Sequence, residues 1–379
     1  MKNIQLLNKI APCGTDLFDK AEYAVEETIE NPDAIMVRSA VMHEMEFGTN
    51  LKAIARAGAG VNNIPLDRCA EQGIVVFNTP GANANAVKEL AVCALMLASR
   101  DIVGGIEWAN SLVGTENIAK QVEKGKSKFG GVEITGKTLG IIGLGAIGGM
   151  LANAAESLGM NVIGCDPYLS VEAAWNINSN VKRVATFEDV FKNSDYISVH
   201  VPATAETKGF LNEKSFGIMK DGVRILNLAR ADLVNTDDLK AALESGKVAS
   251  YVTDFPTEET VGVKGIVAIP HLGASTEEAE DNCAVMAAKE LIDYLENGNI
   301  KNSVNYPAVS APRNRANRVC VLHADADGIF STLTTLFKGD FVTKSRGNVA
   351  YTIVDTDEPN NDAVAKAAAL DGVYKVNVI

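Results

Sequence analysis

The sequence lacks both clustered cysteines and any long apolar run. Its six cysteines stand at least 24 residues apart, at positions 13, 69, 93, 165, 283 and 320. That spacing excludes the usual zinc sites and redox dithiols, and unclustered thiols favour a reducing cytoplasm. The longest apolar run, residues 139–152, is 14 residues long and too short to span a bilayer. Residues 1–16 also lack the apolar stretch of a signal peptide.

Basic residues are in the minority. The chain has 35 Lys and Arg against 48 Asp and Glu, a formal net charge of -13. This balance argues against broad binding to nucleic acid or to anionic membranes. If the substrate is an anion, a local cluster of Arg and Lys must therefore bind it.

Length and patterning predict an α/β protein of two or three domains. A chain of 379 residues with 47% hydrophobic residues can bury large cores, which excludes intrinsic disorder. Short β-branched runs, such as residues 33–39, 51–58 and 73–78, alternate with helical patterns, and the alternation restarts after Lys137. Strands that alternate with helices predict parallel sheets covered on both faces.

The restart and the helical joints predict three domains. The first consists of residues 1–95 and 277–305, and the second of residues 96–276. A Pro-, Asn- and Arg-rich segment, residues 306–318, reads as a linker. Residues 315–379 then follow a β-α-β-α-β order that is typical of a small α+β module.

A glycine-rich turn predicts a dinucleotide site. Gly143, Gly145 and Gly148 form a G-x-G-x-x-G motif between an apolar strand and a helix. The first glycine allows a tight turn, the second lets the backbone approach a pyrophosphate, and the third permits close helix–strand packing. The amides of Ala146 and Ile147 open the helix toward the phosphates. Asp166, 18 residues beyond Gly148, is placed to bind the ribose hydroxyls, which favours NAD over NADP.

One of the four histidines, at positions 43, 200, 271 and 323, has the position of a catalytic base. His271 follows the strand-like segment IVAIP, and ligand clefts form at the carboxyl ends of parallel strands. Imidazole is the usual acceptor of a hydroxyl proton near neutral pH. His200 ends another strand and could merely line the cofactor cleft, and His43 reads as a solvated or packed residue.

Two further strand ends carry charged residues. Arg230 follows VRILNLA, and the run from Asp254 to Glu259 follows VASYVT. A guanidinium can clamp a carboxylate bidentately, and a carboxylate bonded to imidazole holds its tautomer. Taken singly, Arg230 could equally form a surface ion pair, and Glu259 could be a solvated loop charge.

Three segments together carry a family resemblance. NLARA (227–231), DFPTEE (254–259) and PHLGAST (270–276), with the glycine motif, resemble the D-isomer-specific 2-hydroxyacid dehydrogenases. The resemblance implies that Arg230 binds the substrate carboxylate and that His271 is the acid/base with Glu259 as its partner. It also implies that Asp254 lies beside the nicotinamide carboxamide. Glu258 is the rival for the role of Glu259, and Thr260 departs from the family, which usually has proline there.

The resemblance extends to fold and substrate. It implies a flavodoxin-like substrate domain, a Rossmann NAD domain and, within the family, greatest similarity to members that oxidise D-3-phosphoglycerate. In this interpretation the amides of Ala59, Gly60 and Val61 cradle the substrate carboxylate. Arg38 and Arg56 become candidates for the phosphate, with ordinary strand-end salt bridges as the alternative. Lys126 or Lys128 of a partner chain could complete that site.

The C-terminal module resembles an ACT domain, which in several relatives binds serine. His323 and Gly328 match the serine-binding pattern, whereas Asp325 replaces an asparagine and Asp327 a proline. Serine sensing and a purely oligomerising role therefore both remain open for residues 315–379.

The resemblance implies NAD-dependent oxidation of D-3-phosphoglycerate to 3-phosphohydroxypyruvate, the first step of the phosphorylated route to serine. It further implies a homodimer or homotetramer with a possible amino-acid effector. The charge balance, the cysteine spacing and the lack of long apolar runs predict a cytoplasmic protein with no metal and no nucleic-acid or membrane partner. One alternative is a glyoxylate/hydroxypyruvate reductase or another D-2-hydroxyacid dehydrogenase. Another is an NAD-sensing, corepressor-like binding protein, since that function also occurs on this fold.

Overall fold

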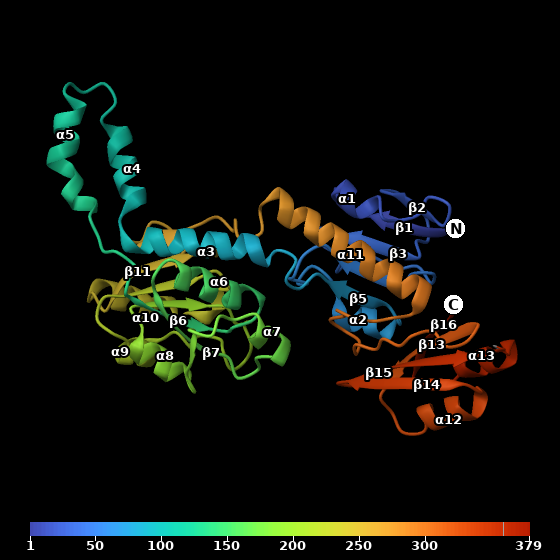
Figure 1. Cartoon of the computed structure of the whole chain (residues 1–379). Coiled ribbons are helices and arrows are strands. Elements are labelled where there is room, and N and C mark those ends of the chain that lie inside the picture. The colour runs from blue at the N-terminus through green and yellow to red at the C-terminus, as the bar shows by residue number, and fades with distance from the viewer. Residues whose placement is uncertain (359) are drawn as a thin grey trace. The chain divides into compact units, whose positions relative to one another are not determined.

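A computed structural model describes residues 1–358 and 360–379, and the chain separates into two compact units (Figure 1). Unit 1 comprises Met1–Asn83 and Glu277–Ile379, and unit 2 comprises Ala84–Thr276. Unit 1 is thus built from two separate stretches of chain and includes the C-terminal module. The division into three domains at residues 95, 276 and 315 stays a prediction.

Unit 1 contains a parallel sheet in the strand order β2-β1-β3-β4-β5. Its strands are β1 (Lys2–Leu6), β2 (Tyr23–Glu26), β3 (Ala34–Val37), β4 (Ala53–Arg56) and β5 (Val75–Asn78). Its helices are α1 (Pro12–Thr15), α2 (Leu66–Glu71) and α11 (Glu277–Asn297). The order 2-1-3-4-5 is that of flavodoxin-like folds, which confirms the predicted class. The buried strands β3, β4 and β5 coincide with the three apolar runs recognised in the sequence.

Unit 2 contains a seven-stranded parallel sheet in the order β12-β11-β10-β9-β6-β7-β8. Its strands are β6 (Thr138–Ile142), β7 (Asn161–Cys165), β8 (Lys182–Arg183), β9 (Tyr196–Val199), β10 (Val223–Asn227), β11 (Val248–Thr253) and β12 (Ile266–Ala268). Its covering helices are α3 (Ala84–Ser99), α6 (Ala146–Ser157), α7 (Val171–Trp175), α8 (Phe187–Asn193), α9 (Glu213–Ile218) and α10 (Thr236–Glu244). This is the Rossmann strand order with one added strand, and its topological switch point lies between β6 and β9.

An arm interrupts unit 2 between α3 and β6. It consists of α4 (Ile102–Ser111), α5 (Ile118–Gly125) and a 3-10 turn, Lys126–Phe129. Figure 1 shows α4 and α5 extending away from the sheet of this unit. The rings of Trp108 and Phe129 lie 5.3 Å apart and join the turn to α4. Ile106 and Val113 of the arm are exposed, which leaves apolar surface in contact with solvent.

The C-terminal module is an antiparallel four-stranded sheet in the order β14-β15-β13-β16. Its elements are β13 (Asn317–Ala324), α12 (Ile329–Leu336), β14 (Asp340–Arg346), β15 (Val349–Thr356), α13 (Asn361–Ala368) and β16 (Val373–Val378). The order is β-α-β-β-α-β, so the prediction of one strand between the two helices is wrong. The sequence pattern did not predict β14 because this exposed edge strand has few apolar residues. Gly347, with φ 61°, lies in the tight turn between β14 and β15.

This module packs directly on the first sheet of unit 1. Cys320, Leu322 and Tyr351 share one core cluster with Phe77 and Tyr294 of that sheet and of α11. The segment read as a linker is packed as well, since Tyr306 is buried and its hydroxyl donates to the Ala70 carbonyl at 2.6 Å. The module is therefore fixed within unit 1 rather than tethered to it.

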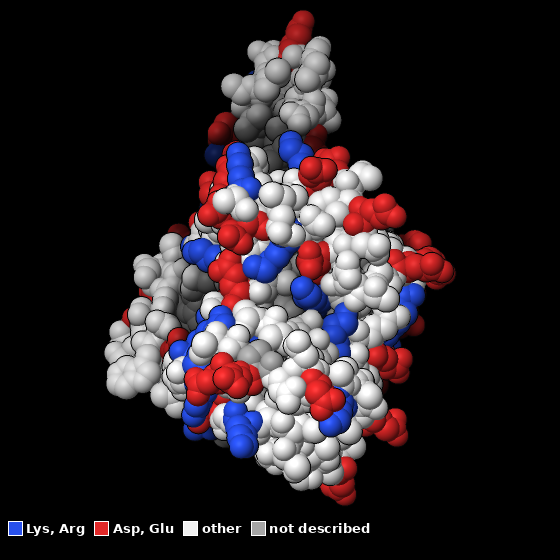
Figure 2. Space-filling model, turned by 90° about the vertical axis from the view of Figure 1, so that its right-hand side faces the viewer, with Lys and Arg blue, Asp and Glu red and all other residues white. Residues whose placement is uncertain are grey.

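Charges of both signs are mixed on the face of the molecule that Figure 2 shows. Figure 2 shows Lys and Arg side chains lying among Asp and Glu side chains on one face of the molecule. Among the described helices, none is both long and apolar enough to cross a membrane.

Candidate functional site

The glycine motif of unit 2 forms a tight turn between β6 and α6. Gly143 adopts φ 90°, and a side chain there would collide with the His200 carbonyl. A side chain at Gly148 would collide with the carbonyl of Gly143, so this residue allows the helix to approach the strand. Nothing lies within 4 Å of the position that a Gly145 side chain would occupy. The turn is therefore closed on the protein side and open at Gly145.

The N-terminus of α6 has the groups that a pyrophosphate requires. Gly145 is the N-cap and supplies no capping side chain, so the first-turn amides of Ala146, Ile147 and Gly148 are directed out of the helix. The first bond within the helix runs from the Gly149 amide to the Gly145 carbonyl, at 2.9 Å. These three amides donate to no acceptor within the described residues, and together with the positive end of the helix dipole they favour a bound anion.

Asp166 lies directly after β7 and beside this turn. Its Oδ2 accepts the Leu144 amide and its Oδ1 accepts the Tyr168 amide, both at 2.9 Å. Each oxygen retains a lone pair, so a pair of ribose hydroxyls can still donate to the carboxylate. The open turn, the free amides and this acceptor fit the two phosphates and one ribose of a dinucleotide.

Three neighbouring strand ends bring Arg230, Phe255 and His271 together. They follow β10, β11 and β12, which are adjacent in the sheet and parallel. The ring of Phe255 lies 4.8 Å from that of His271, and the Arg230 guanidinium lies 5.9 Å from the Phe255 ring centre. Sequence reasoning placed Arg230 and His271 but assigned no role to Phe255. The sequence signal for Phe255 was its place in the DFPTEE segment, between two strand ends that carry charged residues.

Asp254 holds the loop that carries His271. It is buried, its Oδ1 accepts the Leu272 amide and its Oδ2 accepts the Gly273 amide, each at 2.8 Å. His271 has φ 56°, a left-handed conformation that costs on the order of 1 kcal/mol. Burial raises the pKa of Asp254, although these two amides and His271 act in the opposite direction. The carboxylate therefore stabilises a strained turn at the end of β12.

Asn227 has a matching role beside Arg230, and sequence reasoning missed it. This buried side chain donates from Nδ2 to the Arg230 carbonyl at 2.8 Å and to the Tyr251 hydroxyl at 2.9 Å. Its Oδ1 accepts the amides of Ala229 and Arg230. A buried amide at the end of an apolar strand thus fixes the backbone from which the Arg230 side chain emerges.

Glu258 and Glu259 lie in an exposed turn between β11 and β12. Thr260 is buried and closes this turn, accepting the Thr257 amide at its Oγ1 at 2.8 Å. Among the described residues, no hydrogen bond or ion pair joins Glu259 to His271. The pairing of Glu259 with His271 therefore stays a prediction. The family usually has proline at the position of Thr260. In this chain hydrogen bonds of Thr260, rather than a proline ring, hold the turn in place.

Unit 1 has its own cluster at the ends of β3, β4 and β5. Arg38 pairs with Glu280 of α11 at 2.6 Å, and the Arg56 Nε donates to the Arg38 carbonyl at 3.1 Å. The two arginines are therefore neighbours, as two adjacent strand ends predict. The backbone N–H groups of residues 59–61, which follow β4, donate to no other group in the described part of the chain. Cations and free amides at one sheet edge suit an anion.

Comparison with known proteins agrees with this geometry. Residues 103–273 match the family model described as "D-isomer specific 2-hydroxyacid dehydrogenase, NAD binding domain". A relative from Schizosaccharomyces pombe, named "Putative D-3-phosphoglycerate dehydrogenase", is 32% identical over 368 residues, covering 88% of this chain and 75% of that protein. The chain belongs to the D-isomer specific 2-hydroxyacid dehydrogenase family. The matched segment contains the glycine turn, Arg230 and His271.

Other members of this family are similar over part of their length. The D-3-phosphoglycerate dehydrogenase of Bacillus subtilis is 37% identical over 294 residues, which is 75% of this chain and 54% of that protein. The chain thus spans about half the length of the first curated relatives that it matches. The crystal structure of NAD+-bound 3-phosphoglycerate dehydrogenase from Entamoeba histolytica has a TM-score of 0.63 and 27% identity, covering 80% of this chain and 98% of that one.

The remaining histidines of this dehydrogenase-family chain are engaged elsewhere. His43 bonds to the Asn62 carbonyl at 2.8 Å, and His200 bonds to the Ser198 hydroxyl at 2.8 Å beside the glycine turn. Burial lowers the pKa of His200 to about 4, which keeps it neutral. In the C-terminal module both ring nitrogens of His323 are used, by the Ala324 carbonyl at 2.7 Å and the Thr352 hydroxyl at 2.9 Å. The His323 ring is thus part of the sheet's own network.

Proposed function

We propose that the chain catalyses the NAD-dependent oxidation of D-3-phosphoglycerate to 3-phosphohydroxypyruvate, the first step of the phosphorylated route to serine. The observation that carries the proposal is the grouping of Arg230, Phe255 and His271 at one end of the sheet that contains the dinucleotide turn. The names of the relatives support the choice of substrate. The free thiols of all six cysteines support the cytoplasm as its location.

The cofactor residues are proposed as Gly143, Gly145, Gly148 and Asp166, with the amides of Ala146 and Ile147. NAD, when bound, supplies the acceptor for the hydride that leaves C2 of the substrate. The carboxylate of Asp166 accepts bonds from ribose hydroxyls and repels a 2′-phosphate, which favours NAD over NADP. Asp254 is proposed to lie beside the nicotinamide carboxamide and, through the amides of residues 272 and 273, to hold the His271 turn.

The residues of unit 2 that act on the substrate are proposed as Arg230, Glu259 and His271. His271 takes the proton of the C2 hydroxyl, which allows negative charge to build on that oxygen as the carbonyl forms. Arg230 clamps the substrate carboxylate and orients C2. Phe255 packs against both side chains and restricts their rotamers, so the base and the clamp are held before substrate binds. Glu259 is proposed to orient the imidazole.

The residues of unit 1 that bind the anionic groups are proposed as Arg38, Arg56 and the amides of Ala59, Gly60 and Val61. The amides take the carboxylate, and the guanidinium groups take the phosphate. The ion pair between Arg38 and Glu280 is half exposed, so a doubly charged phosphate can compete with Glu280 for Arg38. Because the chain has a negative net charge, an anionic substrate must be bound by a local set of donors, and these arginines and amides form such a set.

Oligomerisation is proposed through the arm of unit 2. Ile106 and Val113 expose 56% and 83% of their surface, and Ile118 of α5 is exposed as well. Apolar side chains on an extending arm favour burial against a second copy of the chain. Lys126 or Lys128 at the end of the arm is proposed to complete a partner's phosphate site, where Lys126 would exchange its present ion pair with Glu123. The assembly is proposed as a homodimer or homotetramer. An amino-acid effector of the C-terminal module is proposed without a residue assigned to it.

An assay of NADH formation tests the proposed function. The purified chain is mixed with NAD and, separately, with D-3-phosphoglycerate, D-glycerate and D-lactate, and absorbance at the NADH band is followed. We expect the highest kcat/KM with D-3-phosphoglycerate. Preference for an unphosphorylated hydroxyacid would instead support a reductase or D-lactate-type dehydrogenase. NAD binding without turnover of any of the three would support an NAD-sensing protein.

Replacing Arg56 by alanine tests the phosphate site. We expect kcat/KM for D-3-phosphoglycerate to fall on the order of 100-fold, because a charge-assisted contact to the phosphate is lost. With D-glycerate, which has no phosphate, kcat/KM should change little. The two substrates control for any structural effect of the substitution. An equal loss on both would show that Arg56 does not bind the phosphate.

A further inference from the structure

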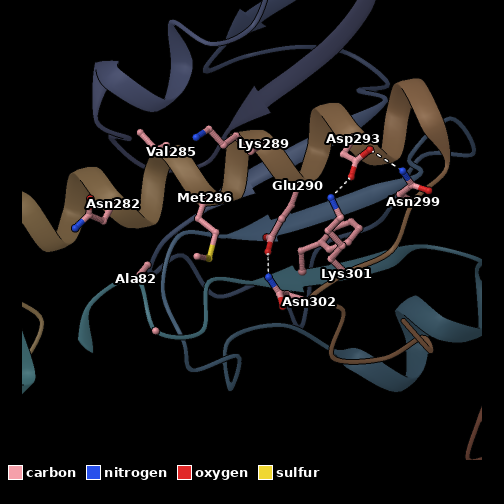
Figure 3. A pocket seen from close by; sticks show the side chains of 12 residues that line it. Ala82, Asn282, Val285, Met286, Lys289, Glu290, Asp293, Asn299, Lys301 and Asn302 are labelled. Atoms are coloured by element: carbon pink, nitrogen blue, oxygen red, sulfur yellow. Dashed lines mark hydrogen bonds and ion pairs between the residues drawn. The ribbon is translucent and has the colours of Figure 1, made fainter. Parts of the chain in front are cut away.

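Unit 1 contains a cavity of about 470 Å³ between α11 and the segments that follow β5 and α11 in the chain. Its lining includes Ala82, Met286, Glu290, Asp293 and Asn302, and all of these residues belong to unit 1. Figure 3 shows Met286 and Glu290 projecting from α11, with the Glu290 carboxylate directed to Asn302. Ala82 lies across from them, near the end of the segment that leads into unit 2. None of the cavity residues has a place in the proposed dehydrogenase reaction.

Glu290 is an unusual residue for the position it occupies. The opposite side of α11, with Ala284, Ala287 and Leu291, packs into the core of unit 1. Glu290 lies at the margin of that face and is only 7% exposed. Its Oε1 accepts the Asn302 Nδ2 at 2.6 Å, and its Oε2 has no partner among the described residues. A buried carboxylate oxygen without a donor is destabilising.

Asp293, the next acidic residue on the same helix, is paired where Glu290 is not. Asp293, three residues on, pairs with Lys301 at 2.7 Å and accepts amides from Asn297 and Asn299. Burial alone would raise the pKa of Asp293, but these three donors lower it. Since Lys301 is occupied by Asp293, no cation is left inside the cavity for Glu290. The remaining cation of the lining, Lys289, is exposed.

The charge of Glu290 is consequently poorly compensated. Burial raises its pKa to about 7, although Asn302 and Lys301 act in the opposite direction. Both the protonated and the ionised carboxyl are therefore populated near neutral pH. A donor that brings a positive charge would satisfy Oε2 and the negative charge together, which an apolar ligand or an anion cannot do.

We propose that this cavity is a ligand site for a small molecule that carries a protonated amine beside a short apolar group. The ammonium donates to Oε2 of Glu290, and the apolar part packs on Met286, Val285 and Ala82. These three side chains supply the apolar wall, and Glu290 and Asn302 supply the polar end. None of the lining residues acts in the dehydrogenase reaction proposed above, so binding at this site can be measured without turnover.

The experiment compares three probes of equal shape and different charge: n-butylammonium, n-butanol and butyrate. Binding to the full chain is measured by isothermal titration calorimetry at pH 7 in two buffers with different heats of ionisation. We expect n-butylammonium to bind most tightly and to release protons on binding, since it displaces the proton of the protonated Glu290 carboxyl. The other charged groups of the lining are Lys289, Asp293 and Lys301.

Two substitutions, at Glu290 and Met286, and one control substitution, at Glu278, locate the probe. Glu290→Gln keeps the shape of the side chain, and we expect it to weaken n-butylammonium binding about 10- to 100-fold and to abolish proton release. Glu278→Gln, an exposed acid on the same helix, is the matched control and should bind the probe as the wild type does. Met286→Trp, which fills the apolar end, gives an independent loss of binding. Circular dichroism verifies that each variant is folded.

The contrary results are equally definite. Absence of n-butylammonium binding would overturn the proposal. Binding of n-butanol or butyrate as tight as that of the amine would also overturn it, because the site would then not select a positive charge. Unchanged binding to Glu290→Gln would show that the probe binds elsewhere.

Discussion

Replacing His271 by alanine is expected to lower kcat for D-3-phosphoglycerate oxidation by about 100- to 10,000-fold, while NAD still binds. The substitution removes the group proposed to accept the hydroxyl proton. The dinucleotide turn follows β6, and in the described part of the chain the hydrogen bonds of Asp166 run to the Leu144 and Tyr168 amides and not to His271. The measurement combines steady-state rates of NADH formation with a titration of NAD by protein fluorescence. Near-full turnover in this variant would refute the proposed mechanism.

The two glutamates of the adjoining turn provide an internal comparison. If Glu259 orients His271, Glu259→Gln should reduce kcat at least about tenfold and leave the KM for NAD unchanged. Glu258→Gln, one residue away in the same exposed turn, should retain the wild-type kcat. Equal kcat values in the two variants would rule out an orienting role for Glu259, and the reverse result would assign that role to Glu258.

Replacing Arg318 by alanine is expected to reduce the free energy of unfolding by about 3–5 kcal/mol. Arg318 is fully buried at the start of β13, and its guanidinium forms a bidentate pair with Asp355, at 2.6 and 2.9 Å. The same guanidinium donates to the carbonyls of Asn297, Ala311 and Pro312. Removing it leaves the Asp355 carboxylate and three carbonyls without these donors. Urea denaturation followed by far-UV circular dichroism measures the change.

A nearby surface arginine is the control for this prediction. Arg315 pairs with Asp340 and Asp357 at exposed positions, so Arg315→Ala should leave the free energy of unfolding close to that of the wild type. If Arg318→Ala is no less stable than Arg315→Ala, the buried pair does not hold the C-terminal module in place.

The Arg318–Asp355 pair also predicts a dependence on pH. Burial alone would raise the pKa of Asp355, but bonds from Arg318 and the Asn314 amide hold it below its ordinary value. The unfolded state then binds a proton more readily than the folded state does. The contribution of this pair is therefore complete above the ordinary pKa of aspartate and is lost as the pH falls through the lowered value.

The sequence predicted the local motifs because their geometry depends on residues that are neighbours in the chain. The spacing of Gly143, Gly145 and Gly148 specifies a turn that a few consecutive φ and ψ angles determine, and the structure has that turn. The apolar runs at β3, β4 and β5 are strands because they are buried on both faces. The exposed edge strand β14 has few apolar residues, so its sequence did not separate it from a loop.

The sequence did not predict contacts between residues that are distant in the chain. Arg318 lies in a segment rich in Pro, Asn and Arg, which is typical of a linker, yet its side chain is completely buried. Glu290 has the helical spacing of a solvent-facing acid, and only the packing of α11 against residues 299–302 encloses it. Phe255 lies between Arg230 and His271 because three strands become neighbours in the sheet, an order that alternation of strands and helices does not specify.

The sequence by itself determined the α/β class, the dinucleotide turn with Asp166, and the strand ends that carry Arg38, Arg56, Arg230 and His271. Each of these rests on short-range patterns or on the rule that parallel strands end at one edge. Only the tertiary structure decided that the C-terminal module is packed into unit 1, that Asp254 and Asn227 hold the His271 and Arg230 backbones, and that Glu290 faces a cavity. Whether a charged side chain is buried and paired depends on residues distant in the chain. Packing of those residues removes water from some charged side chains and leaves others exposed.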